Sequence, residues 1–297
     1  MGLGAAMHAL NSFLTKIATP IAMPLGLEHL PRNFPWIVYS ALGFTFVHLV
    51  VAPFGSRWIA PVSYGKLQGR RAKNNWDIHV VSLVHALIII TLASRSLNRP
   101  GLAADPTYGS DTIAELTHSI AVGYFIWDTI DAMVNFTDLG FVLHGMACTF
   151  VYTLTFRPIL QYFAIRFLFW ELSTPFLNIH WFLDKTGYTG STFQFINGAF
   201  LLSTFFLVRI VYGWYTSIFF WRIMFKSSSG MPMLYWVVFM TGHTVLMSLN
   251  LIWFGKMIKS LRKRFDSDQD PKRPLLTPSD GAQQQNYVDT NPIDGAA

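Results

Sequence analysis

Seven long apolar runs set the first constraint on how this chain folds. Each is near the ~20 residues that an α-helix needs to cross ~30 Å of hydrocarbon at about 1.5 Å per residue. The chain is 52% hydrophobic and 13% charged, whereas soluble domains carry about 25% charged residues. A cytosolic enzyme is thereby excluded, and we predict an all-α polytopic membrane protein with about seven transmembrane helices. The runs cover residues 34–54, 79–97, 114–136, 139–156, 159–183, 193–221 and 233–258.

Basic residues lie in two short blocks that predict the orientation of the chain in the membrane. One block follows the first run and the other follows the seventh, so six crossings separate them and both lie on one side. The positive-inside rule makes that side cytosolic, which places the C-terminal tail in the cytosol and the N-terminus on the lumenal or extracellular side. The blocks are Arg57, Lys66, Arg70, Arg71 and Lys73, and then Lys256, Lys259, Arg262, Lys263 and Arg264.

The chain divides into four segments. Residues 1–33 are mildly apolar without the pattern of a cleaved signal peptide, and we expect them to lie at the membrane interface. Residues 34–65 hold the first transmembrane helix and part of the basic loop, and residues 66–264 hold the remaining six runs. Residues 265–297 are polar and contain several prolines and glutamines, which predicts a disordered cytosolic tail.

Several kinds of site are excluded by residues that the sequence lacks. The single cysteine, Cys148, excludes a disulfide framework and a zinc or iron–sulfur site built from thiols. No two of the nine histidines stand three or four residues apart, which excludes histidine-box metal sites. We therefore expect no metal and no resident cofactor. The net charge of +6 comes from the two basic blocks, which orient the chain in a membrane, so we expect no nucleic-acid partner.

Ionisable side chains within the apolar runs indicate where chemistry could take place. Each costs about 2.5–3.5 kcal/mol on insertion scales, so those that persist should face the bundle interior or a cavity. Asp128 and Asp131 stand three residues apart in the third run, and His144 lies about one turn from the start of the fourth. A carboxylate that orients an imidazole raises its basicity, as a general base requires. In the fifth run, Pro175 is expected to kink the helix at Glu171, four residues earlier.

A purely structural role is the alternative for these groups. Arg166 and Arg209 lie in the fifth and sixth runs, where they can form internal ion pairs with the acids. Such pairs and hydrogen bonds between helices contribute about 1 kcal/mol each. From the residues alone, both interpretations stay open for Asp128, Asp131 and His144.

Four motifs in chain order resemble the TLC domain. They are NWDIHVVSLVHA at 75–86, GYFIWD at 123–128, DLGFVLH at 138–144 and ELSTPFLNIHW at 171–181. Translocating-chain-associating membrane proteins, longevity-assurance ceramide synthases and a neuronal-lipofuscinosis protein share this domain. The last motif is most similar to small TLC-domain-containing proteins of the TMEM56-like branch. The resemblance covers residues 66–264.

The resemblance implies an address in the endoplasmic reticulum or another endomembrane and a role in lipid homeostasis. It implies His144 as a base or transient acyl carrier, with Asp128 or Asp131 orienting it and acyl-CoA as a candidate co-substrate. Ceramide synthases carry a second histidine where this chain has Gly145, so the resemblance does not extend to ceramide synthesis. The candidate lipid-contacting residues are His85, His118, Tyr124, Glu171 and Asn178.

The leading hypothesis is a multi-pass endomembrane protein that binds a lipid or acyl chain in its helix bundle. It would influence membrane lipid composition, by acyl transfer if it is an enzyme. A non-catalytic lipid sensor or chaperone is the main alternative, and a transporter or seven-helix receptor is a weaker one. The sequence leaves open which lipid is bound, whether the protein catalyses a reaction and whether it forms a homo-oligomer.

Overall fold

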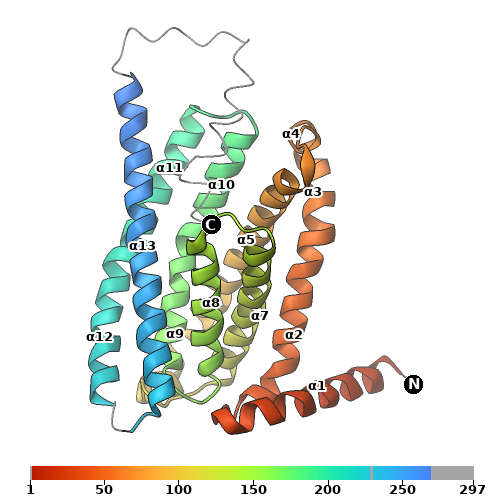
Figure 1. Ribbon diagram of the computed structural model, residues 1–297, viewed down its shortest axis with the longest axis vertical. Coiled ribbons are helices and arrows are strands. Elements are labelled where there is room, and N and C mark those ends of the chain that lie inside the picture. Colours follow the sequence, from red (N-terminus) through yellow and green to blue (C-terminus); the bar gives the residue numbers. More distant parts are fainter. Residues whose placement is uncertain (1, 228–229, 269–297) are drawn as a thin grey trace.

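The structure is a computed structural model that describes residues 2–227 and 230–268. Every regular element in this part of the chain is helical, which confirms the predicted all-α class. Most of the helices run side by side along one long axis and form a bundle (Figure 1). The predicted tail, residues 265–297, lies outside the described residues from position 269 onward.

The predicted apolar runs correspond to helical rods, three of which consist of three consecutive pieces. Single helices form the second, third, fourth and seventh rods, whereas a π-helix or a 3-10 helix interrupts the first, fifth and sixth. In chain order the rods are α2 (Leu30–Phe46) with η1 (Val47–Val51) and α3 (Ala52–Ile59), α5 (Gly69–Ser96), α7 (Thr112–Val134), α8 (Leu139–Leu154), α9 (Gln161–Phe167) with η2 (Leu168–Ser173) and α10 (Thr174–Lys185), α11 (Thr192–Phe205) with η3 (Phe206–Val211) and α12 (Tyr212–Lys226), and α13 (Met233–Asp268).

Four helical segments in the described residues are long and apolar enough to cross a membrane. The fourth rod, α8, is apolar but shorter, and α7 carries three acidic residues, Glu115, Asp128 and Asp131. The chain is therefore a polytopic integral membrane protein, and the count of seven crossings stays a prediction. The four segments are Leu30–Ile59, Gly69–Ser96, Thr192–Lys226 and Met233–Arg262.

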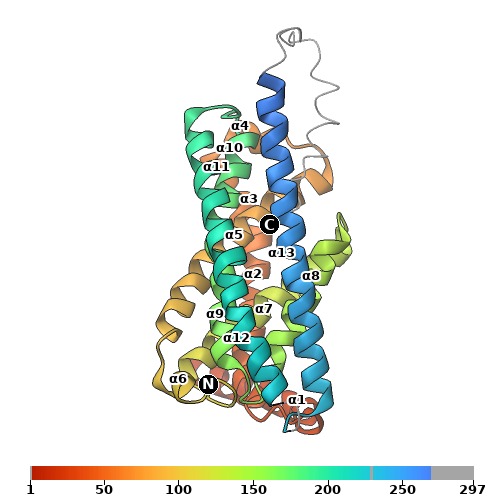
Figure 2. The ribbon, with the colours of Figure 1, turned by 90° about the vertical axis from the view of Figure 1, so that its left-hand side faces the viewer.

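The two basic blocks lie at the same end of the bundle. The short helix α4 (Pro61–Gly65), within the first block, and the C-terminal end of α13, within the second, share that end in both views (Figure 1 and Figure 2). This placement agrees with the even number of helices predicted between the blocks. Which compartment this end faces stays a prediction from the positive-inside rule.

The N-terminal helix α1 (Leu3–Leu25) lies across the opposite end of the bundle (Figure 1). Its Ala18 and Ala22 are buried, whereas Phe13 and Met23 are exposed. The helix ends at Gly26, whose φ of 65° is a left-handed conformation that favours glycine, and its N–H bonds to the carbonyl of Ala22. An apolar helix placed across the bundle suits the predicted interfacial position, which stays a prediction.

The third rod, α7, is held between α2 and α8 by close contacts at two glycines. A Cβ at Gly123 would lie 2.5 Å from the carbonyl oxygen of Ile37 and 2.5 Å from the Cβ of Ser40, both on α2. A Cβ at Gly145 on α8 would lie 2.5 Å from Oγ1 of Thr129 on α7. Any side chain at these positions would push the helices apart. The small residues therefore set the distances between the three helices.

We predict that Gly123→Ala lowers the free energy of unfolding by about 1–3 kcal/mol, because the added methyl group overpacks a backbone contact. Unfolding of the purified protein in detergent, followed by circular dichroism during a denaturant titration, measures the change. Gly43→Ala on α2 is the matched control, since a Cβ there has no neighbour within 4 Å. Equal stability of the two variants would contradict the proposed contact.

Candidate functional site

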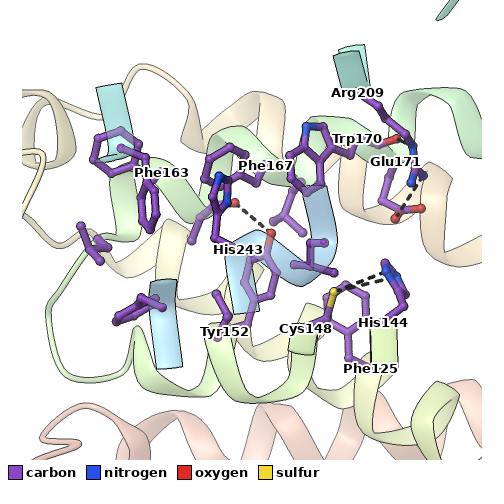
Figure 3. Close-up of a pocket in the computed structure, with 17 residues that line it drawn as sticks. Phe125, His144, Cys148, Tyr152, Phe163, Phe167, Trp170, Glu171, Arg209 and His243 are labelled. Atoms are coloured by element: carbon purple, nitrogen blue, oxygen red, sulfur yellow. Dashed lines mark hydrogen bonds and ion pairs between the residues drawn. The ribbon is translucent and has the colours of Figure 1, made fainter. Parts of the chain in front are cut away.

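A narrow interior cavity of about 40 Å³ lies between α8, the rods of η2 and η3, and α13. Apolar and aromatic side chains form most of its wall, among them Phe163 and Phe167 (Figure 3). At the other end Glu171 and Arg209 point toward one another and His144 lies next to Cys148, whereas His243 and Tyr152 lie along the aromatic part (Figure 3). The cavity thus has an apolar body and a charged end.

The charged end continues into a second, smaller space of about 10 Å³. His144, Glu171 and Arg209 line both spaces. Asp128 and Tyr124 of α7 join them in the smaller one. Asp128, Tyr124, His144 and Glu171, all candidates from the sequence, therefore surround one common interior region.

The imidazole of His144 is held among a thiol and two aromatic rings. Cys148, one turn further along α8, has its Sγ 3.8 Å from Nε2 of His144. The rings of Phe125 and Trp253 pack edge-on against the imidazole with centroids 6.1 and 5.5 Å away. These contacts fix the plane of the ring and leave it beside the polar space.

Glu171 reaches this space because the fifth rod is interrupted. The 3-10 segment η2 contains Glu171, and α10 begins at Thr174 with Pro175 in its first turn. The proline has no N–H to donate to the Glu171 carbonyl, so the regular α-helical ladder cannot continue there. The regular α-helix is interrupted at Glu171, and the predicted kink there stays a prediction. Oε2 of Glu171 accepts a hydrogen bond of 2.8 Å from Thr174 Oγ1.

Arg209 is one of the residues of this site that the sequence did not single out as functional, as are Cys148 and His243. It is 4% exposed and lies in the π-helix η3. Its Nη2 is 3.9 Å from Oε1 of Glu171. The guanidinium donates hydrogen bonds to the carbonyl of Trp170 at 2.9 Å, Ser173 Oγ at 3.1 Å, Asn250 Oδ1 at 3.1 Å and Thr174 Oγ1 at 3.3 Å. The arginine thus ties η2, η3 and α13 together.

Of three further candidates from the sequence, two support the wall of the smaller space and one lies elsewhere. The ring of His85 stacks on that of Tyr124 with centroids 3.5 Å apart, so it supports a residue of the cavity wall. Asn178 supports the wall in the same way, because its Nδ2 donates to Ser82 Oγ at 3.1 Å. His118 is fully buried elsewhere, with Nδ1 3.1 Å from Thr155 Oγ1, and lines neither space.

Asp131 is not brought to His144. Its carboxylate accepts hydrogen bonds from Asn135 Nδ2 at 2.9 Å and from Asn74 Nδ2 at 3.3 Å. Three residues along an α-helix correspond to about 300° of rotation, so Asp128 and Asp131 are about 60° apart on α7. That difference is enough for Asp128 to face the interior while Asp131 faces α5 and a separate groove.

The sequence predicted no metal site. Among the described residues, no group of three or more histidine, cysteine, aspartate or glutamate side chains is arranged to hold a metal ion. The polar end of the cavity offers instead one imidazole, one thiol, a carboxylate pair and a guanidinium. Such groups can bind a polar head or exchange a proton with it.

We predict that Arg209→Gln destabilises the protein by about 3–5 kcal/mol, because it leaves Glu171 and several acceptors without their buried cationic partner. Arg222→Gln, at an exposed arginine of α12, is the control and should change the stability by less than about 0.5 kcal/mol. Denaturant unfolding in detergent compares the two variants. Equal effects would show that the Arg209 network contributes little.

The amino-acid sequence of this chain is similar to those of several known proteins. A family model described as the TLC domain matches residues 75–259. A TLC domain-containing protein of Schizosaccharomyces pombe is 37% identical, with 84% of this chain and 86% of the relative aligned. Topoisomerase I damage affected protein 4 of Saccharomyces cerevisiae is 31% identical over 82% of this chain and 88% of that protein. TLC domain-containing protein 4 of Homo sapiens is 29% identical over 65% and 76%. No solved structure matches the chain.

Proposed function

This chain belongs to the TLC-domain family, and on that premise we propose that it is a lipid-handling protein of the endoplasmic reticulum or another endomembrane. It takes a lipid or acyl chain into its helix bundle and thereby influences membrane lipid composition. The C-terminal tail lies in the cytosol, as the two basic blocks indicate. Membrane lipids are its partners in this proposal.

The observation that carries this proposal is the polarity of the interior cavity. An amphiphile needs an apolar wall for its chain and a few placed polar groups for its head. Phe163 and Phe167 belong to the apolar wall, and His144, Glu171 and Arg209 form the polar end. At about 40 Å³ the space holds only a few methylene groups, so binding requires lining side chains to change rotamer.

A photoreactive phospholipid with a diazirine on its acyl chain tests occupancy of the cavity. In nanodiscs, we expect irradiation to label the cavity wall, at residues such as Phe163, Phe167 and Phe239. Ala164→Phe, which fills the cavity, should lower this labelling about tenfold, because overpacking opposes entry of the chain. Peptide mass spectrometry locates and quantifies the label.

The control for this experiment is Ala199→Phe, which adds the same ring at an exposed position of α11. It should leave labelling of the cavity unchanged. Label confined to outward-facing side chains in the unmodified protein would contradict binding inside the bundle.

Acyl transfer is a second candidate, supported by the position of His144 beside the polar space. In this reaction an acceptor hydroxyl or amine gives its proton to His144, and its oxygen or nitrogen bonds to the acyl carbon of acyl-CoA. The thiolate of coenzyme A leaves and takes up the proton. Ceramide synthesis is not favoured, because Gly145 packs against Thr129 and leaves no room for the second histidine of the ceramide synthases.

The purified protein, acyl-CoA and either a sphingoid or a lysophospholipid acceptor test this reaction. If the protein is a transferase, His144→Ala should lower kcat by about 10²–10⁴, as is typical for loss of a general base. Product formation is followed by mass spectrometry. Equal turnover in both proteins removes His144 from the mechanism, and no turnover in either favours the lipid sensor or chaperone.

A further inference from the structure

A second and larger cavity lies on the other side of α7. It is a groove of about 500 Å³ between the rod of α2, η1 and α3, the N-terminal part of α5 and the C-terminal part of α7. The proposed function does not use this groove, since His144 lies in the interior and Asp131 lines the groove. The inference drawn from it is independent of that function.

The groove starts next to the close contact between α2 and α7 and extends to the basic end. Its first lining residues, Ala41 and Ile126, follow the contact between α2 and α7 at Gly123. Toward the end of the groove, Leu49 and Val134 are 66% and 64% exposed. These side chains offer an apolar wall at the surface of a membrane protein, where acyl chains are the surrounding solvent.

Charges of both signs lie in the same groove. Arg70 and Lys73, at the start of α5, are exposed cations. Asp77, one turn after Lys73, and Asp131 on α7 supply two carboxylates. The charge of Asp131 is already stabilised by the amide groups of two asparagines.

Asp77 is the unsatisfied group of this set. It is 6% exposed, and its Oδ2 accepts a hydrogen bond of 3.2 Å from the hydroxyl of Tyr64. Burial and the neighbouring carboxylate raise the pKa of Tyr64 to about 12, so the hydroxyl keeps its proton and remains a donor. Oδ1 of Asp77 has no hydrogen-bond partner among the described residues. A buried carboxylate oxygen without a donor is costly. Oδ1 is itself buried, so a ligand in the groove reaches it only after the Asp77 side chain, which belongs to the groove wall, turns toward that ligand.

The mixture of charges selects among membrane lipids. A headgroup that carries only negative charge would meet two carboxylates, and one that carries only positive charge would meet Arg70 and Lys73. A zwitterionic headgroup presents a phosphate to the cations and an ammonium to the carboxylates. A primary ammonium also supplies the N–H donor that Oδ1 of Asp77 lacks, whereas a quaternary ammonium does not.

We propose that this groove binds one glycerophospholipid with a phosphoethanolamine headgroup. The phosphate lies between Arg70 and Lys73. The Asp77 side chain turns toward the groove when the lipid binds, and the ammonium donates to its Oδ1. The acyl chains follow the apolar wall that includes Leu49 and Val134. The site selects its lipid by the hydrogen-bond donors of the headgroup and not by net charge.

A series of lipids that differ only in methylation of the headgroup nitrogen tests this selection. Dioleoyl phosphatidylethanolamine, its monomethyl and dimethyl derivatives, and dioleoyl phosphatidylcholine keep the charges and chains while the N–H donors fall from three to none. Native mass spectrometry of the full-length protein measures the binding of each. We expect the first three to bind within about threefold of one another and phosphatidylcholine at least about tenfold more weakly, since it loses the charge-assisted hydrogen bond.

Variants of the groove assign the effect to its two charged groups. Asp77→Asn keeps an acceptor for Tyr64 and removes the charge. This variant should therefore bind phosphatidylcholine as tightly as the three lipids that carry N–H donors. Arg70→Gln combined with Lys73→Gln should weaken all four lipids by a similar factor of about ten, because the phosphate loses its partners. Arg95→Gln, at an exposed arginine near the other end of α5, is the matched control and should change nothing.

Three outcomes would overturn the proposal. The first is equal binding of all four lipids by the unmodified protein, and the second is weaker binding of phosphatidylcholine that persists in Asp77→Asn. The third is tighter binding of dioleoyl phosphatidylserine than of dioleoyl phosphatidylethanolamine, which would indicate selection by net negative charge. The methylation series decides the question even if a variant fails to fold. His144→Ala should keep the headgroup preference, so failure of the interior lipid site and failure of the groove are distinguishable.

Discussion

The position of α7 depends on backbone contacts at two glycines, and the arrangement of both cavities depends on α7. Gly123 allows α2 to approach one side of this helix, and Gly145 allows α8 to approach another. In lipid, apolar surface gains little from leaving the solvent, so close packing of this kind carries much of the association between helices. The same helix then presents Asp128 to the interior and Asp131 to the groove. One rigidly held helix thus separates two polar sites inside a largely apolar molecule.

Buried charge is the second determinant of the interior. An arginine in hydrocarbon is costly unless its donors are used, and Arg209 directs its donors to four hydrogen-bond acceptors and lies near Glu171. Those acceptors lie on η2 and α13 and at the start of α10, so the satisfied charge also fixes how these segments meet. The break at Pro175 is a precondition, because a continuous α-helix would keep Glu171 within a regular turn. The polar end of the cavity is therefore a structural network whose surface is available to a ligand.

Sequence patterns predicted the rods well, because length and hydropathy follow from the thickness of the bilayer. They also predicted that Asp128, His144 and Glu171 approach one another, since short connections make consecutive helices neighbours. Helical spacing did not show which of Asp128 and Asp131 faces the interior space beside His144. The two side chains differ by only about 60° around the helix, and this difference matters only once the neighbouring helices are placed. His118 was grouped with the site for the same reason, although it lies where Thr155 can meet it. The groove was not predicted, because its residues come from three successive rods and the sequence does not give the rotation of each rod about its axis.

The two cavities suit different parts of a lipid because their charges are balanced differently. In the interior, Arg209 and Glu171 lie close together and their remaining hydrogen bonds are made within the protein, so the space beside them has little demand for a charged ligand. An acyl chain or a weakly polar acceptor fits such a space at small electrostatic cost. In the groove, Lys73 lies one turn before Asp77 on α5, yet Oδ1 of Asp77 lacks a donor. In the proposed complex, a ligand that brings its own separated charges satisfies these groups. The unpaired carboxylate oxygen of Asp77 is then half of a hydrogen bond that the headgroup completes.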